Sequence, residues 1–127
     1  MTATGGDGRE ARRLLERAEE FLDAARDSLA RGRYNVAFEE ARTAAELGCK
    51  ALLVMATGDY PRSHNVVPAL HHARLTPKGL DAKALGAFLG ASNRGVYGFD
   101  EPVGEEEARQ GVAMAAQVLA ELRRHRL

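Results

Sequence analysis

The chain has 127 residues, of which 45% are hydrophobic, so it holds enough apolar material for one domain with a buried core. Eighteen Lys and Arg residues balance eighteen Asp and Glu residues, which excludes a net positive field that draws the whole molecule onto nucleic acid or anionic lipid. A single cysteine, Cys49, excludes an intrachain disulfide framework and any multi-cysteine zinc site.

The first eight residues are small and polar, and we expect them to form a loosely ordered tail before a single helical domain over residues 9–127. The sequence contains no apolar run long enough to span a membrane, and its start lacks the apolar core of a signal peptide. We therefore expect a soluble cytoplasmic protein without membrane contact.

Two long helices are predicted in the first half of the chain. Residues 9–31 carry apolar side chains at helical spacing, at Leu14, Ala18, Phe21, Ala25 and Leu29, and Gly32 ends the helix. Residues 34–57 form the second helix, whose inner line is made of very small residues: Ala37, Ala41, Ala44, Gly48 and Ala51. Such a line lets another backbone come close, so we expect it to pack on a neighbouring helix or on a second copy of the chain.

Two short helices and one long helix are predicted in the second half. Ser63 or Asn65 caps a short helix that carries Val66, Val67 and Leu70, and residues 80–92 form the next helix, with Leu85, Phe88 and Leu89 on one side. Residues 94–104 form a loop, and the last helix begins at Glu105, where three glutamates meet its positive dipole end. The predicted fold is an all-α, antiparallel up-and-down bundle of about four to five helices.

The sequence gives no support for a metal or cofactor site. His71 and His72 are adjacent, so on a helix their side chains diverge by about 100 degrees and do not grip one ion together. Cys49 lies in the small-residue part of the second helix, where we expect a buried, inert thiol. We expect neither a metal nor a cofactor.

A polar line follows the second helix at helical spacing, at Asn35, Glu39, Arg42, Glu46 and Lys50. Glu46 and Lys50 form an i to i+4 pair, which is ordinary on a solvated face. Because the rest of this helix is almost entirely apolar, the same line is also a candidate lining for a cleft.

Several segments, in their order along the chain, resemble the HEPN domain family. Gly32, Tyr34 and Asn35 resemble the aromatic-Asn step that opens the family's second helix, and the alanine-rich helix that follows ends in Lys50-Ala-Leu-Leu. His64 follows the next turn, and the stretch from Arg94 to Tyr97 is similar to the family's loop before the closing helix.

The resemblance implies a small helical bundle that forms a homodimer. Many such proteins are metal-independent ribonucleases acting as toxins, and others pair with a small nucleotidyltransferase. The ribonucleases carry an arginine followed four to six residues later by a histidine; the arginine stabilises phosphate charge and the imidazole moves protons. Arg94 has no histidine at that spacing, and neither has any other arginine of this chain.

Three hypotheses follow. In the first, the chain is a non-catalytic binding module for a nucleotide, RNA or a nucleotidyltransferase, with ligand-binding candidates Arg94, Tyr97, Asn35, His64, Glu46 and Lys50. In the second, it is a metal-independent ribonuclease with an altered catalytic set, for which Arg94, His64 and Tyr97 are the candidates. In the third, it is a structural subunit whose small-residue helix face forms a dimer.

Overall fold

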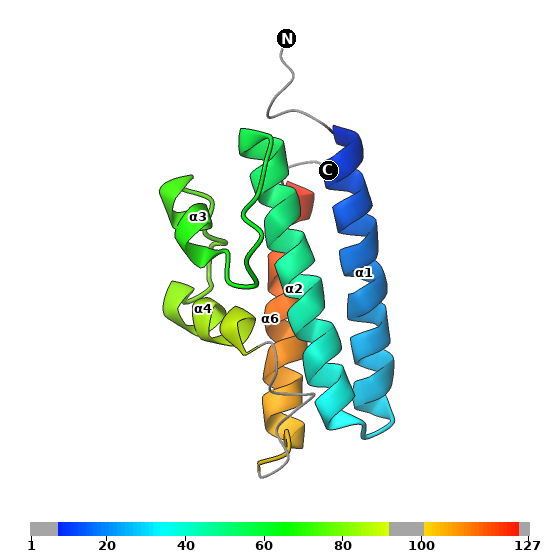
Figure 1. The fold of residues 1–127 in the computed structure, drawn as a ribbon. Helices are drawn as coiled ribbons and strands as arrows, with labels where there is room; N and C mark the ends of the chain where they lie inside the picture. The colour runs from blue at the N-terminus through cyan, green and yellow to red at the C-terminus, as the bar shows by residue number, and fades with distance from the viewer. Residues whose placement is uncertain (1–7, 92–100, 125–127) are drawn as a thin grey trace.

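The computed structural model describes residues 8–91 and 101–124 of the chain. The described residues form helices and no strand, as Figure 1 shows. Their bounds are α1 (Gly8–Ala30), α2 (Tyr34–Thr57), α3 (Val67–His72), α4 (Ala82–Gly90) and α6 (Glu105–Arg124). The prediction of an all-α helical bundle is confirmed. Of the expected tail, residues 1–7 lie outside the described residues and Gly8 begins α1.

The hairpin of α1 and α2 forms the largest helix contact of the bundle. Gly32 stands in the connection with a φ of +74°, a conformation that favours glycine. One predicted core residue of α1 is wrong: Phe21 is 39% exposed, and Leu22 is buried in its place. Both positions lie one turn from the buried Ala18 and Ala25, so spacing alone does not distinguish them. The rotation of α1 about its axis is set by burial of all its apolar residues together, and this rotation turns Leu22 inward.

The small-residue line of α2 packs against α6 within the chain. A Cβ atom added at Gly48 would lie 3.0 Å from side-chain atoms of both Val118 and Leu119. Ala41 and Ala44 on the same line are completely buried in the single chain. Of the two expected partners, the line therefore packs on helices of the same chain, with α6 at Gly48, and it is not free to form the dimer interface of the third hypothesis.

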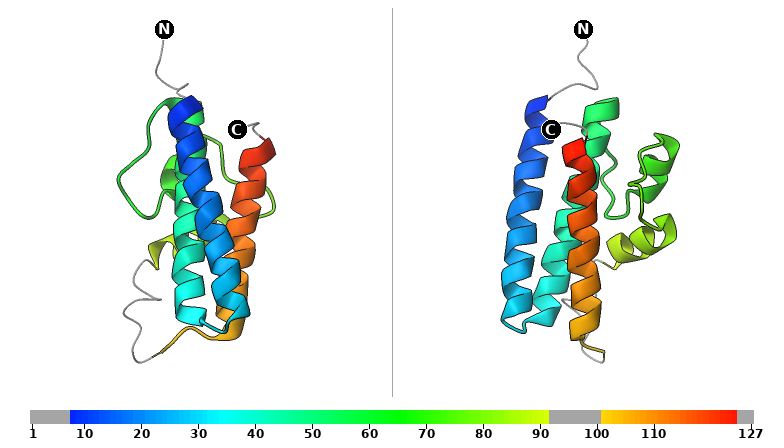
Figure 2. Two further views of the ribbon diagram at one scale, coloured as in Figure 1. Left: turned by 90° about the vertical axis from the view of Figure 1, so that its right-hand side faces the viewer. Right: turned by 180° about the vertical axis from the view of Figure 1, so that it is seen from behind.

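The last helix runs parallel to α2. The first residues of the two helices meet where the Tyr34 hydroxyl contacts Glu105, and further along both helices Gly48 meets Leu119. Figure 2 shows α1, α2 and α6 as three long helices side by side, with α1 running the opposite way. The chain returns to the start of the bundle between α2 and α6 by way of α3 and α4.

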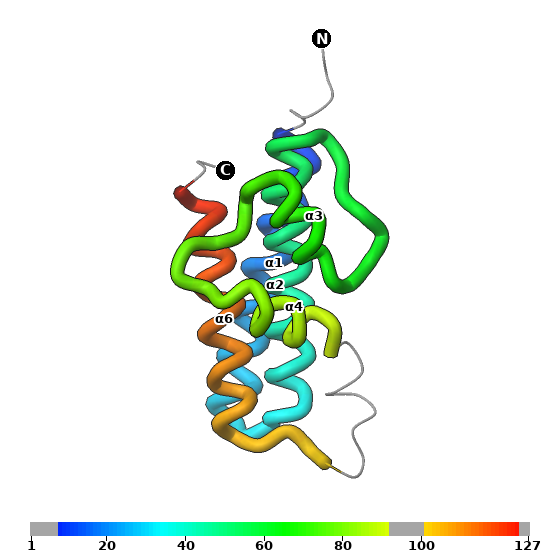
Figure 3. Tube along the Cα trace, turned by 90° about the vertical axis from the view of Figure 1, so that its left-hand side faces the viewer, coloured from blue at the N-terminus to red at the C-terminus, as the bar shows by residue number. Residues whose placement is uncertain are grey.

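The two short helices lie on one side of the bundle, as Figure 3 shows. The Asn65 side chain accepts a hydrogen bond from the Val67 amide, 3.1 Å away, at the start of α3. Asp81 caps α4 by accepting from the amide of Lys83, so α4 begins two residues later than predicted. Its predicted core residues, Leu85, Phe88 and Leu89, are buried.

The described part of the predicted loop, residues 101–104, precedes α6 without helical structure. Val103 is buried there. The helix then begins at Glu105, as predicted. None of the helices in the described ranges is both long and apolar enough to cross a membrane.

Candidate functional site

A buried cluster of charged side chains lies on α2, formed by Glu39, Arg42 and Glu46 with Lys50 beside them. Arg42 is only 4% exposed and Glu46 only 8%. The Arg42 guanidinium donates to Glu46 Oε1 at 2.7 Å and to Glu39 Oε1 at 2.9 and 3.0 Å. The predicted polar line is thus not a solvated face, because its centre is covered by the rest of the fold.

His64 reaches this cluster from the segment after α2. Its Nδ1 atom lies 2.9 Å from Glu46 Oε1, while Lys50 Nζ donates to Glu46 Oε2 at 2.8 Å. Burial opposes ionisation of Glu46, but the hydrogen bonds from Lys50, Arg42 and His64 outweigh it, so the pKa of Glu46 lies below its ordinary value. Glu46 is therefore an ionised carboxylate that binds three nitrogen donors.

The charges of the cluster balance one another. Two carboxylates, Glu39 and Glu46, face two permanent cations, Arg42 and Lys50, and each cation is bound to a carboxylate. The Lys50 ammonium also lies 5.3 Å from the centre of the Tyr60 ring, within cation–π range. The cluster therefore leaves no permanent cation unpaired for a phosphate.

Cys49 is completely buried next to this cluster in the sequence. Burial, with a smaller effect of the Glu46 charge, raises the pKa of the Cys49 thiol to about 12. The thiol is thus protonated at neutral pH, and the prediction of a buried cysteine is confirmed.

Asn35 lies near the other end of α2 and has a different contact. Its Oδ1 atom accepts a hydrogen bond from the backbone amide of Val103, 2.9 Å away. Eleven residues of helix, about 16 Å at the α-helical rise, separate Asn35 from Glu46. The structure therefore brings His64, Glu46 and Lys50 together but leaves Asn35 apart, holding the chain before α6.

Arg94 and Tyr97 lie outside the described residues, so their predicted roles stay predictions. The residue that sequence reasoning underestimated is Arg42, whose guanidinium anchors both carboxylates of the cluster. The only sign of this role in the sequence was the position of Arg42 on the polar line. Its burial depends on chain segments far from it in sequence, which spacing along one helix does not reveal.

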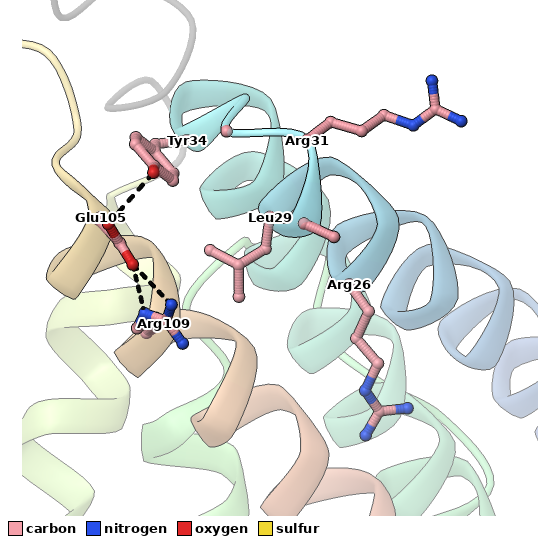
Figure 4. Close-up of a pocket in the computed structure, with 8 residues that line it drawn as sticks. Arg26, Leu29, Arg31, Tyr34, Glu105 and Arg109 are labelled. Atoms are coloured by element: carbon pink, nitrogen blue, oxygen red, sulfur yellow. Dashed lines mark hydrogen bonds and ion pairs between the residues drawn. The ribbon is translucent and has the colours of Figure 1, made fainter.

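A second polar site lies where the α1–α2 connection meets the start of α6. A hollow of about 560 Å³ is lined by Arg26, Arg31, Tyr34, Glu105 and Arg109, among others. The Tyr34 hydroxyl donates to Glu105 Oε1 at 3.2 Å, and Arg109 Nε donates to Glu105 Oε2 at 2.9 Å. Figure 4 shows these three side chains together, whereas the Arg26 and Arg31 guanidinium groups point away from Glu105.

The side chains of this second site determine one another's ionisation states. Hydrogen bonds from Arg109 and Tyr34 lower the pKa of Glu105. Burial and the Glu105 charge together raise the pKa of Tyr34, which therefore stays a neutral phenol. Glu105 occupies the position between the donors that an external anion would need.

A mostly apolar groove of about 460 Å³ is lined by residues of α2, α4 and α6. Its lining includes Phe38, Ala87, Phe88, Gly111 and Met114, and Glu107 is its one charged member. The rings of Phe38 and Phe88 meet edge to face, 5.3 Å apart. The lining of the groove thus combines two aromatic rings with a methionine and several small side chains.

Next to this groove, the exposed side chains in the middle of α6, over residues 110–120, are uncharged, whereas Glu106, Arg109, Arg123 and Arg124 are exposed nearer its ends. Gln110, Ala113, Gln117 and Ala120 are exposed and follow one line along the helix. Residues 110–120 contain no charged residue, although 28% of the whole chain is charged. The exposed side of α1 is in contrast rich in charged side chains such as Arg13, Glu16, Arg17 and Asp23.

No group of three or more His, Cys, Asp or Glu side chains in residues 8–91 and 101–124 is placed to hold a metal ion. In particular, His64 and Glu46 form a pair without a third such ligand. The pair thus offers acid–base or nucleophilic chemistry from an imidazole.

Comparisons with known proteins agree with this architecture. The sequence profile of the HEPN domain family matches residues 11–125. Among solved structures, the chain is similar to the crystal structure of TT1696 from Thermus thermophilus, with a TM-score of 0.71 and 24% sequence identity, covering 91% of this chain and 97% of that chain. At this identity the likeness shows the fold alone. Comparison with curated proteins finds no match.

The match to the family profile begins in the first turns of α1 and continues past the end of α6. It therefore includes the α1–α2 hairpin, the short helices and the closing helix that together build the bundle. Because the match spans nearly the whole chain, the protein belongs to the HEPN domain family.

Proposed function

We propose that the chain is a non-catalytic HEPN module that binds a protein, the small nucleotidyltransferase of a toxin–antitoxin-like pair. The observation that carries this proposal is the uncharged middle of the exposed side of α6, at Gln110, Ala113, Gln117 and Ala120. A stretch of exposed helix without charged side chains can be covered by another protein without the cost of burying charge, and charged residues are depleted at the centres of protein interfaces.

The groove beside this surface supports the same function. Phe38, Phe88 and Met114 line it, so it offers a pocket for an apolar side chain of a partner. We refer to the groove and the uncharged middle of α6 together as the α4–α6 face. The family resemblance supplies the class of partner.

Two observations support the absence of ribonuclease activity. No arginine in the sequence is followed four to six residues later by a histidine. In the buried cluster, Arg42 and Lys50 are each paired with a carboxylate, so neither is free to stabilise charge on a phosphate. Nucleotide or RNA binding by Arg94, Tyr97, Asn35 and His64 stays a prediction.

The first test is whether the reading frame beside that of this chain encodes a small nucleotidyltransferase, since its absence would contradict the proposal. That protein is then mixed with the full chain, and the mass of the mixture is measured by light scattering. We expect a complex with the wild-type chain and loss of the complex in Ala113→Glu, which places a charge on the α4–α6 face. Ala56→Glu is the matched control, because Ala56 is also exposed on a helix but lies at the far end of α2.

A partner that binds Ala113→Glu as tightly as wild type would contradict the proposal. So would a nucleotidyltransferase that forms no complex with the wild-type chain. A homodimer dissolved by Ala113→Glu would assign the α4–α6 face to a second copy of this chain instead.

One observation favours the alternative ribonuclease function. Glu46 orients His64, whose ring is otherwise open to solvent, with 62% of the side chain exposed. RNA cleavage that is insensitive to a chelator and disappears in both Arg94→Ala and His64→Ala would support this alternative. RNA that stays intact with the wild-type chain would exclude it.

A further inference from the structure

His64 differs from the other described histidines in what its ring contacts. Its Nδ1 atom lies 2.9 Å from Glu46 Oε1, and most of the side chain is exposed. His71 and His72 are also exposed, at the end of α3, but no contact described for them involves a carboxylate. The three histidines that the structure describes thus include one oriented imidazole, His64, and two references, His71 and His72.

The contact with Glu46 determines which ring nitrogen of His64 carries the proton. Glu46 is an ionised carboxylate, because it also receives hydrogen bonds from Arg42 Nη1 at 2.7 Å and Lys50 Nζ at 2.8 Å. An ionised carboxylate only accepts hydrogen bonds, so His64 Nδ1 must donate. In the neutral ring the lone pair is then on Nε2.

Glu46 is also held in place. It is 8% exposed, and both of its oxygens are bound to cations from the same helix. A carboxylate fixed in this way orients the imidazole and stabilises positive charge that develops on the ring. Exposure and orientation together are what a nucleophilic histidine needs.

We infer that His64 is a nucleophilic histidine whose Nε2 atom accepts a phosphoryl group from a small donor of the phosphoramidate or acyl phosphate class. The Nε2 lone pair forms the N–P bond. The P–N or P–O bond of the donor breaks, and its electron pair leaves with the amine or the carboxylate. Glu46 stabilises the cationic ring until the Nδ1 proton passes to water. This inference goes beyond the proposed function and does not depend on the nucleotidyltransferase.

The experiment incubates the full chain with phosphoramidate and follows each histidine by mass spectrometry of peptides kept at alkaline pH. We expect His64 to be phosphorylated about tenfold faster than His71 and His72, in line with the usual effect of a carboxylate that orients an imidazole. Glu46→Gln should reduce the rate at His64 to that of the other two. The control Glu20→Gln, at an exposed position on α1, should leave it unchanged.

Because Glu46→Gln also removes a partner of Arg42, a second measurement uses the unaltered chain. Long-range proton–nitrogen NMR spectra report the tautomer of each neutral histidine ring. We expect His64 to carry its proton on Nδ1. A proton on Nε2, or equal rates of phosphorylation at His64, His71 and His72, would overturn the inference.

Discussion

Removal of the Arg42 guanidinium should cost the fold about 3 kcal/mol, because it leaves the largely buried carboxylate of Glu39 without its cation. In Arg42→Met, Glu39 loses both of the hydrogen bonds that Arg42 gives to its Oε1 atom. The other oxygen, Oε2, is buried with no partner among the described residues. Glu46 keeps Lys50 and His64, and the Glu39 side chain is 23% exposed, so the cost lies at the lower end for a broken buried ion pair.

The assay is urea unfolding followed by circular dichroism at neutral pH. Arg31→Met is the matched control, since Arg31 pairs with Asp27 at 3.1 Å but both side chains are more than half exposed. Loss of that surface pair should cost about 0.5 kcal/mol. The double variant Arg42→Met with Glu39→Gln should recover part of the loss. If Arg42→Met is no more destabilising than Arg31→Met, the cluster is not the buried ion-pair network described above.

Three further predictions concern packing, acid and the thiol. Gly48→Ala should lower the free energy of unfolding by about 1 kcal/mol net, since overpacking against α6 exceeds the gain in helix propensity. Gly86→Ala, where the added Cβ atom has its nearest neighbour at 3.7 Å, should raise the free energy of unfolding by about 1 kcal/mol. The same urea titration measures both. The pKa of Glu46 is lower in the folded chain than in the unfolded chain. Ionised Glu46 therefore stabilises the fold above the unfolded-state pKa, and this stabilisation is lost as the pH falls through the folded-state pKa. In Glu46→Gln the melting temperature should consequently decline less steeply in acid than in wild type. Cys49 should react with a thiol reagent in native buffer only at the rate of unfolding, and fast reaction would contradict its burial.

Helical periodicity predicted much of the fold because each long helix buries a stripe that recurs along its own sequence. The predicted bounds of α2 match the structure, and the three glutamates at the start of α6 lie where its positive dipole end favours them. Phe21 shows the limit of this reasoning, because two neighbouring positions satisfied the same spacing. The parallel course of α2 and α6 depends on how the chain returns through α3 and α4, which no local pattern specifies.

The candidate site was harder to predict because its contacts join distant parts of the chain. Glu46 and Lys50 are visible as a helical pair, but His64 joins them from eighteen residues away. Asn35 binds the backbone amide of Val103, which is sixty-eight residues away. The sequence shows that Asn35 is polar but does not show which group it binds. The sequence left two interpretations open for the polar line that includes Arg42, a solvated face or the lining of a cleft, because burial of one side of α2 depends on what packs against it.

The α4–α6 face is the centre of the proposed function, and hydrogen–deuterium exchange tests it most directly. The exchange of the full chain is measured by mass spectrometry with and without the small nucleotidyltransferase proposed as its partner. We predict slower exchange in residues 82–91 and 110–120 when the partner is present, with α1 unchanged. Slower exchange on the charged side of α1, with no change in α4 and α6, would contradict the account.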